Sequence, residues 1–244
     1  MPNFDKARAG DPLRIPAATY NELLAMLAWY RGQGRGLGSQ SGFTRDPDVV
    51  PLKNGSGADI ADPFNVLGID SPLFTPSDNL TEFKFNFALK GVTPDDVTHY
   101  SQVAILQAPV VDNGVVPAVL SGLSIVKLDV GHASHTHADV KDNDKTKLKT
   151  EFSGSARILW KESGTGDKWG IVRLGEGPQT VLGKTDAAIA KGASGTVSIW
   201  TPDATSDTGA NVTSVANRFA DVAITKWVFV TWLGKYPHLS AKEC

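Results

Sequence analysis

Residues 103–130, VAILQAPVVDNGVVPAVLSGLSIVKLDV, decide the fold class because they alternate β-branched runs with turn residues. Val, Ile and Leu fill each run, and such residues favour strands. Asn113 and Gly114 stand between two of the runs, and this dipeptide is a strong signal for a hairpin turn. Pro117 and Gly122 break the remainder into strand-sized pieces. The stretch therefore predicts a series of short antiparallel strands.

The same alternation continues on both sides of this stretch. Residues 155–163 and 168–175 predict a second hairpin. Trp160 and Trp169 flank its turn, and we expect them to pack in the core. Residues 81–91, TEFKFNFALKG, alternate Phe with polar residues and predict a half-buried strand. Residues 226–233, KWVFVTWL, are apolar on both faces, which predicts a strand buried on two sides. Short strands at this spacing are typical of small barrels or sandwiches.

The first forty residues have a different character. Residues 14–31 predict one amphipathic helix, and a stretch with five glycines in eleven residues, 32–42, follows as an extended arm. Such a helix must dock either on its own domain or on another chain, and the pattern does not choose between them. The apolar face predicts an anchor or oligomer contact through four residues, Tyr20, Leu23, Leu24 and Leu27.

The sequence therefore predicts a mainly β protein, with small β-barrel or sandwich modules preceded by one N-terminal amphipathic helix and a Gly-rich arm. We expect an anchor over residues 1–40, a β domain over 41–176, and a small β-barrel-like domain over 177–244. The two β segments share a style but no period that can be aligned, so no internal repeat is predicted.

Composition limits the classes of partner. The 244 residues carry 24 basic and 26 acidic side chains, a formal net charge of −2, so we expect neither a nucleic-acid nor a membrane partner. The one cysteine, Cys244, excludes an intrachain disulfide. With no stretch of signal-peptide or membrane-spanning character, we expect synthesis in a cytoplasm.

Residues 131–140, GHASHTHADV, hold three of the five histidines. On a strand, His135 and His137 would point to one face, where both imidazoles could reach one metal ion. Around a threefold axis, one such pair per chain would give six nitrogens to Fe or Zn. The other interpretations are a solvated surface loop and a catalytic metal site.

The catalytic interpretation is a metallohydrolase that uses His132, His135, His137 and Asp139. The spacing resembles the opening of the metallo-β-lactamase metal motif, but Val140 and Lys141 follow where that motif continues with another His and a glycine pair. A catalytic zinc also needs a distant ligand that no motif here supplies. The sequence therefore predicts no catalytic residues and no resident cofactor, with His135 and His137 as a candidate metal pair between subunits.

Four stretches together resemble structural proteins of tailed bacteriophages, a family without assigned catalytic residues: residues 13–27, 65–84, 153–175 and 217–244. Residues 103–130 are also similar in style to small β-barrel proteins that decorate capsids. The resemblance implies a structural protein of the virion, made in the cytoplasm of the host bacterium. We expect a head decoration or head fibre that binds other virion proteins and itself, as a homotrimer or higher homo-oligomer.

Two alternatives remain open. The first is a tail fibre, an adaptor or a virion protein that binds a receptor or glycan through loop aromatics and the polar loop 201–211. The second is the metallohydrolase described above.

Overall fold

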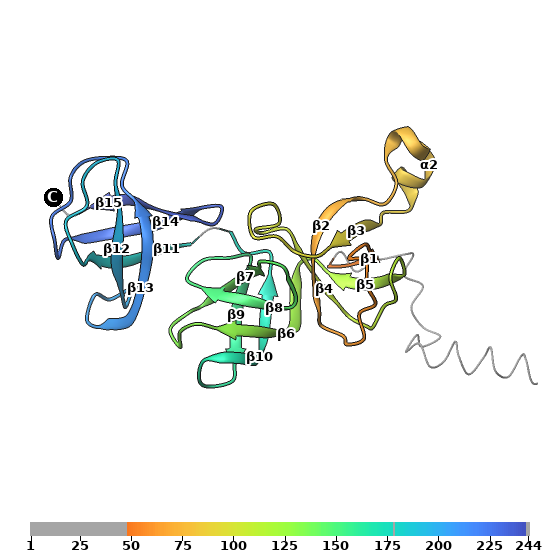
Figure 1. Ribbon diagram of the computed structural model, residues 1–244, viewed down its shortest axis with the longest axis horizontal. Helices are drawn as coiled ribbons and strands as arrows, with labels where there is room; N and C mark the ends of the chain where they lie inside the picture. Colours follow the sequence, from red (N-terminus) through yellow and green to blue (C-terminus); the bar gives the residue numbers. More distant parts are fainter. Residues whose placement is uncertain (1–47, 178, 243–244) are drawn as a thin grey trace, which may run out of the picture. The chain divides into compact units, whose positions relative to one another are not determined.

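The computed structural model describes residues 48–177 and 179–242, and within them the strands form three closed five-stranded barrels (Figure 1). The first barrel contains β1 (Val49–Asn54), β2 (Val66–Pro72), β3 (Leu89–Val92), β4 (Val103–Leu106) and β5 (Val115–Val119). Its strand order is β1-β3-β2-β4-β5, and β1 closes it by pairing parallel with β3 and antiparallel with β5. The predicted mainly β fold built from small barrels is confirmed.

The second barrel contains β6 (Gly122–Val130), β7 (His137–Lys141), β8 (Asp144–Glu151), β9 (Ala156–Lys161) and β10 (Gly166–Leu174). Its order is β10-β6-β8-β7-β9. The predicted hairpin over residues 155–175 is confirmed as the antiparallel pair β9–β10. The β6 sequence alternates, so its even-numbered residues from Ser124 to Val130 point inward and are buried.

The third barrel contains β11 (Thr180–Thr185), β12 (Ser194–Trp200), β13 (Asp207–Ala216), β14 (Trp227–Leu233) and β15 (Tyr236–Lys242), in the order β11-β12-β13-β15-β14. Phe152 follows β8 of the second barrel, yet its buried ring packs in the same apolar cluster as the interior of the third barrel. This ring therefore joins the two barrels.

The three barrels share one arrangement of strands. In the first two, the first and third strands pair in parallel and every other pair is antiparallel. In the third, the third and fifth strands form the parallel pair. The first three strands of the first barrel correspond to the last three strands of the third, and its fourth and fifth strands correspond to the first two. With this correspondence, all five strand pairings are the same in the two barrels. The third barrel is thus a circular permutation of the other two.

The strand predicted over residues 81–91 is wrong for its first half. Residues 76–85 form the helix α2 (Pro76–Phe85), and only Leu89–Val92 are in a strand. The backbone N–H of Thr75 donates to Asp78 Oδ2, while the Thr75 hydroxyl accepts from the Asp78 N–H, and this reciprocal capping starts the helix. No residue of α2 is buried, so the alternating phenylalanines form no inward face.

The prediction that residues 226–233 are buried on two sides is also wrong. In β14, Val228, Val230 and Trp232 point into the barrel, whereas Phe229 and Leu233 are exposed on its outside. Packing in the barrel core therefore does not account for the outward apolar side chains of β14.

The two predicted β domains correspond to three barrels. The segment predicted as one β domain, residues 41–176, holds both the first and the second barrel, and the predicted boundary falls between β10 and β11. The predicted helix, the Gly-rich arm and the anchor residues Tyr20, Leu23, Leu24 and Leu27 lie outside the described residues. Within the described ranges, no helix has both the length and the apolar character needed to cross a membrane.

Candidate functional site

The histidine cluster lies in the turn between β6 and β7 of the second barrel. The rings of His132 and His135 have centroids 6.0 Å apart. His137 is the first residue of β7, so His135 precedes the strand and the same-face rule that predicted a shared metal does not apply to the pair. The two rings instead have different surroundings.

His135 contacts the second barrel and its junction with the third. Its Nδ1 lies 3.0 Å from the hydroxyl of Thr150, and its ring meets the ring of Phe152 edge-on at 4.9 Å. Burial, with smaller contributions from His132 and Lys161, lowers the pKa of His135 to about 4. The imidazole is therefore neutral at pH 7.

The hydrogen bonds of Thr150 assign the tautomer of His135. The Thr150 hydroxyl donates to the carbonyl of Asp129 at 3.2 Å and accepts the N–H of Gly131 at 3.1 Å. A hydroxyl has one proton, so towards His135 it acts as an acceptor and Nδ1 carries the imidazole proton. Nε2 is then the unprotonated nitrogen of the ring, which can accept a hydrogen bond.

His137 is buried, and its Nδ1 lies 2.9 Å from the hydroxyl of Thr136. Its Nε2 is buried without a hydrogen-bond partner. Burial lowers the pKa of His137, against the opposing effect of the Glu176 carboxylate. A metal shared between subunits through His135 and His137 stays a prediction.

Asp139 has a structural role in the second barrel. Its carboxylate is buried and accepts the backbone N–H of Ser101 at 2.9 Å, of Val140 at 2.8 Å and of Ser155 at 2.8 Å. Because Ser101 belongs to the loop before β4, this carboxylate ties the first barrel to the second. Gly154 permits the approach, since a Cβ there would lie 2.3 Å from the carbonyl oxygen of Ala138.

The carboxylate of Asp139 is thus occupied by amide donors. Among the residues that the structure describes, no three His, Cys, Asp or Glu side chains gather into a set that could hold a metal ion. The four residues of the metallohydrolase interpretation are therefore not brought together as a ligand set.

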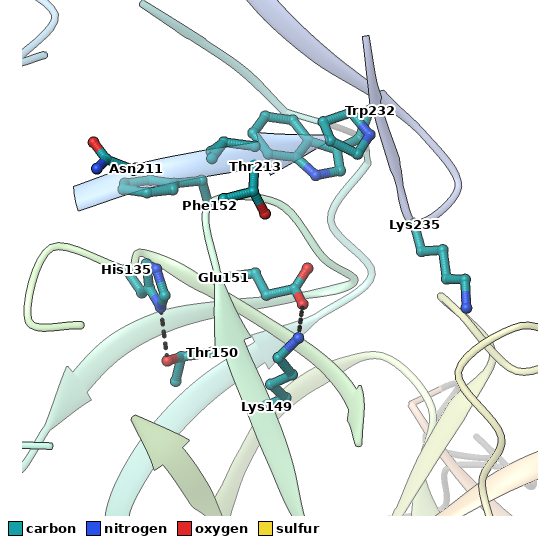
Figure 2. A pocket seen from close by; sticks show the side chains of 11 residues that line it. His135, Lys149, Thr150, Glu151, Phe152, Asn211, Thr213, Trp232 and Lys235 are labelled. Atoms are coloured by element: carbon teal, nitrogen blue, oxygen red, sulfur yellow. Dashed lines mark hydrogen bonds and ion pairs between the residues drawn. The ribbon is translucent and has the colours of Figure 1, made fainter. Parts of the chain in front are cut away.

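A cavity of about 250 Å³ opens beside His135 (Figure 2). The second barrel contributes His135 and residues 149–152, while the third contributes residues 211–213, Trp232, Lys235 and Pro237. Lys149 and Glu151 form an ion pair at 2.8 Å on its wall. Its lining offers amide, hydroxyl, carboxylate, ammonium and neutral imidazole groups, which suit hydrogen bonding to a small polar molecule.

The outer surface of the second barrel carries a different candidate site. Outward side chains of β6, β10 and β9 form an exposed apolar surface, which we call the β6–β10–β9 face. It comprises Leu123, Ile125, Leu159, Trp160, Trp169 and Ile171, each between 40% and 65% exposed. Cross-strand pairing places Ile125 opposite Ile171, and Ile171 opposite Trp160, so the centre is one row across three strands.

The expected packing of Trp160 and Trp169 in the core is wrong. Trp160 is 55% exposed and Trp169 is 41% exposed, because both occupy outward positions of their strands. In the third barrel, Trp200 and Trp227 meet edge-on at 5.3 Å, and the ammonium of Lys184 lies 4.1 Å from the centroid of each. That pair holds a cation of its own chain. The ring of Trp169 likewise has the ammonium of Lys127 at 5.4 Å from its centroid and meets the ring of Phe64 edge-on at 6.5 Å. The signal for the exposed face was the alternation in β6 and β10, whose polar positions are filled by large apolar residues.

Comparison of the sequence and fold with family models, with characterised proteins and with solved structures gives no significant match. The resemblance to tailed-phage structural proteins therefore stays a prediction, and the function has to be argued from the surfaces and cavities described above.

Proposed function

We propose that this chain is a structural protein of a tailed-phage particle, a head decoration or fibre protein that works by assembly. The observation that carries the proposal is the β6–β10–β9 face, where the outward positions of a regular sheet hold isoleucine, leucine and tryptophan. Monomers seldom keep a contiguous apolar surface of this kind in water, and such surfaces usually mark contacts between proteins. In this role the N-terminal segment anchors the chain to other virion proteins.

Further exposed apolar side chains support an assembly role. Leu80, Phe83 and Phe85 are exposed on α2, while Phe229 and Leu233 are exposed on β14. A particle component must meet several neighbours, and separate apolar surfaces on one chain provide separate contacts.

The test is to ask whether the protein is part of a particle. Phage or prophage particles from the strain that encodes the chain would be purified on a density gradient and digested for mass spectrometry. We expect the protein to band with the major capsid protein at a fixed ratio of copies. Its absence from intact particles would overturn the proposal.

The second candidate function is a virion protein that binds a glycan or receptor. The cavity beside His135 favours it, because hydrogen-bonding groups from two barrels converge there. A glycan array with the full chain and with Asn211→Ala separates the two, since a purely structural protein should bind no glycan and the variant should weaken only binding in the cavity.

A further inference from the structure

We propose that the β6–β10–β9 face is where two copies of this chain meet, with the same face of each copy in contact. The inference rests on the proposed function, and it names the partner and the geometry of one contact. It follows from the size of the face, from its strand register and from the charges on either side of its central row.

The size of the face suits a second copy. If a fully exposed large side chain presents roughly 200 Å², the six side chains leave on the order of 600 Å² in water at their observed exposures. A second identical face doubles the buried area to about 1,200 Å², which is the lower end of stable specific interfaces. Two sheet faces also pack readily with their side chains interdigitated.

Strand register sets what lies on either side of the apolar row. The next row in one direction contains Leu123, Arg173 and Arg157. Leu123 and Arg173 lie two residues from the central row, and Arg157 lies three residues from Trp160 because β9 has a bulge there. Two residues in the other direction, β6 and β10 present Lys127 and Trp169, and Glu162 lies beside Trp169, joined to it by a backbone hydrogen bond. The face therefore carries two arginines and a leucine on one side of the row. The other side carries an acid and a tryptophan, whose ring centroid lies 5.4 Å from the ammonium of Lys127.

A twofold axis that runs along the row matches these two sides. It sets each residue of the row against its own copy and exchanges the flanking rows. Arg157 of one copy then meets Glu162 of the other, and Leu123 meets the alkyl chain of Lys127. Arg173 comes beside Trp169, whose ring already has the ammonium of its own Lys127 at 5.4 Å from the centroid. Arg157 and Glu162, of opposite charge, thus meet across the contact, whereas an axis along the strands would place Arg173 against Arg173.

Charges within each copy are compatible with this contact. Arg173 pairs with Glu176 in its own chain and is still about half exposed, at 49% of its side chain. The charge of Arg173 is therefore balanced by Glu176 of its own chain where it comes near Lys127 and Trp169 of the second copy. The net charge of −2 per chain gives little repulsion between copies.

The first test measures the number of copies in the full chain and in Ile171→Lys by native mass spectrometry and sedimentation. Because Ile171 lies at the centre of the row, we expect its replacement to raise the dissociation constant at least about thirtyfold. Ile224→Lys, in the turn before β14, is the matched control, since it makes the same chemical change at a side chain that is 55% exposed and belongs to none of the proposed contact surfaces, and it should leave the number of copies unchanged. An unchanged number of copies in Ile171→Lys, with its circular dichroism intact, would overturn the inference.

The second test identifies the occupant of the face. In a Cys244→Ser background, mild oxidation of Ile171→Cys should join position 171 of one copy to position 171 of the other by a disulfide. Arg173→Cys should form no such disulfide. A benzophenone side chain at position 160 should label residues 156–174 of an isotope-marked second copy. Labelling of residues 13–31 instead would assign the face to the N-terminal segment and overturn the proposed contact.

The failures of the two proposals are distinguishable. A multimer that Ile171→Lys dissociates but that is absent from phage particles would remove the proposed function and leave the contact. A particle protein whose copies do not meet at this face would do the reverse.

Discussion

At the scale of single residues, the buried imidazole of His135 makes stability depend on pH. Its pKa is about 4 in the folded chain and about 6.5 in an unfolded one. Between these values the unfolded chain binds a proton that the folded chain does not, so stability is greatest above pH 6.5 and falls as the pH falls towards 4. The ring is only partly buried, so we expect this histidine to account for about 1–2 kcal/mol of the loss.

Urea unfolding at pH 7, 6, 5 and 4.5 would measure this loss. His135→Gln should flatten the curve, while Asn211→Ser, at another wall residue of the same cavity, should keep its slope. His137 contributes in the same direction, because burial lowers its pKa too, so the slope should shrink and not vanish. If stability falls with pH as steeply in His135→Gln as in the unchanged protein, the lowered pKa of His135 is not the cause.

The carboxylate of Asp139 offers a second prediction at this scale. Asp139→Ala leaves three backbone N–H groups without their acceptor, and we expect it to lower the free energy of unfolding by about 3 kcal/mol or more. Asp139→Asn keeps one acceptor oxygen and should lose less. Thermal unfolding of both variants checks the order, and equal stability of all three proteins would contradict the structural role.

At the scale of elements, the segment after β8 connects two barrels through one ring. Phe152→Ala should cost about 3–5 kcal/mol, because the ring packs in the apolar cluster of the third barrel. Phe85→Ala removes the same atoms from an exposed position of α2 and should cost little. Calorimetry of the two variants makes the comparison. A similar loss in both would show that the Phe152 ring is not part of the core.

The elements also show why sequence reasoning succeeded in some places and failed in others. The β9–β10 hairpin was predictable because its runs and its turn residues agree. The segment 81–85 was not, because Phe83 and Phe85 imitate strand alternation while the capping pair Thr75 and Asp78, several residues upstream, starts a helix. The outward apolar residues of β14 likewise made the strand look buried on two sides. In a sequence, apolar residues at a surface contact cannot be distinguished from apolar residues in a core.

At the scale of the whole molecule, the number of barrels was hidden in the continuous run from residue 115 to 130. Gly122 divides it, since its φ of +83° lies in the left-handed region and turns the chain from the first barrel into the second. The repeat was hidden for another reason. The third barrel starts at a strand equivalent to the fourth strand of the others, so no sequence period aligns them.

Assembly of the molecule should respond to solution conditions as an apolar contact does. We expect 1 M sodium sulfate to keep or increase the number of copies, because excluded salts strengthen apolar burial. A chelator should leave that number unchanged. Native mass spectrometry checks both. If the chelator lowers the number of copies, a metal held by His135 and His137, and not the apolar face, holds the copies together.

The strand order also decides how each barrel meets mechanical tension. In the first two barrels the opening and closing strands are antiparallel neighbours, with Val49 opposite Val119 and Gly122 opposite Leu174, so the chain enters and leaves at the same end. A pull on such a barrel opens its hydrogen bonds one after another. In the third, β14 separates the first strand from the last, and the chain enters and leaves at opposite ends. The same pull loads many bonds at once, so under force the third barrel should be the last to yield.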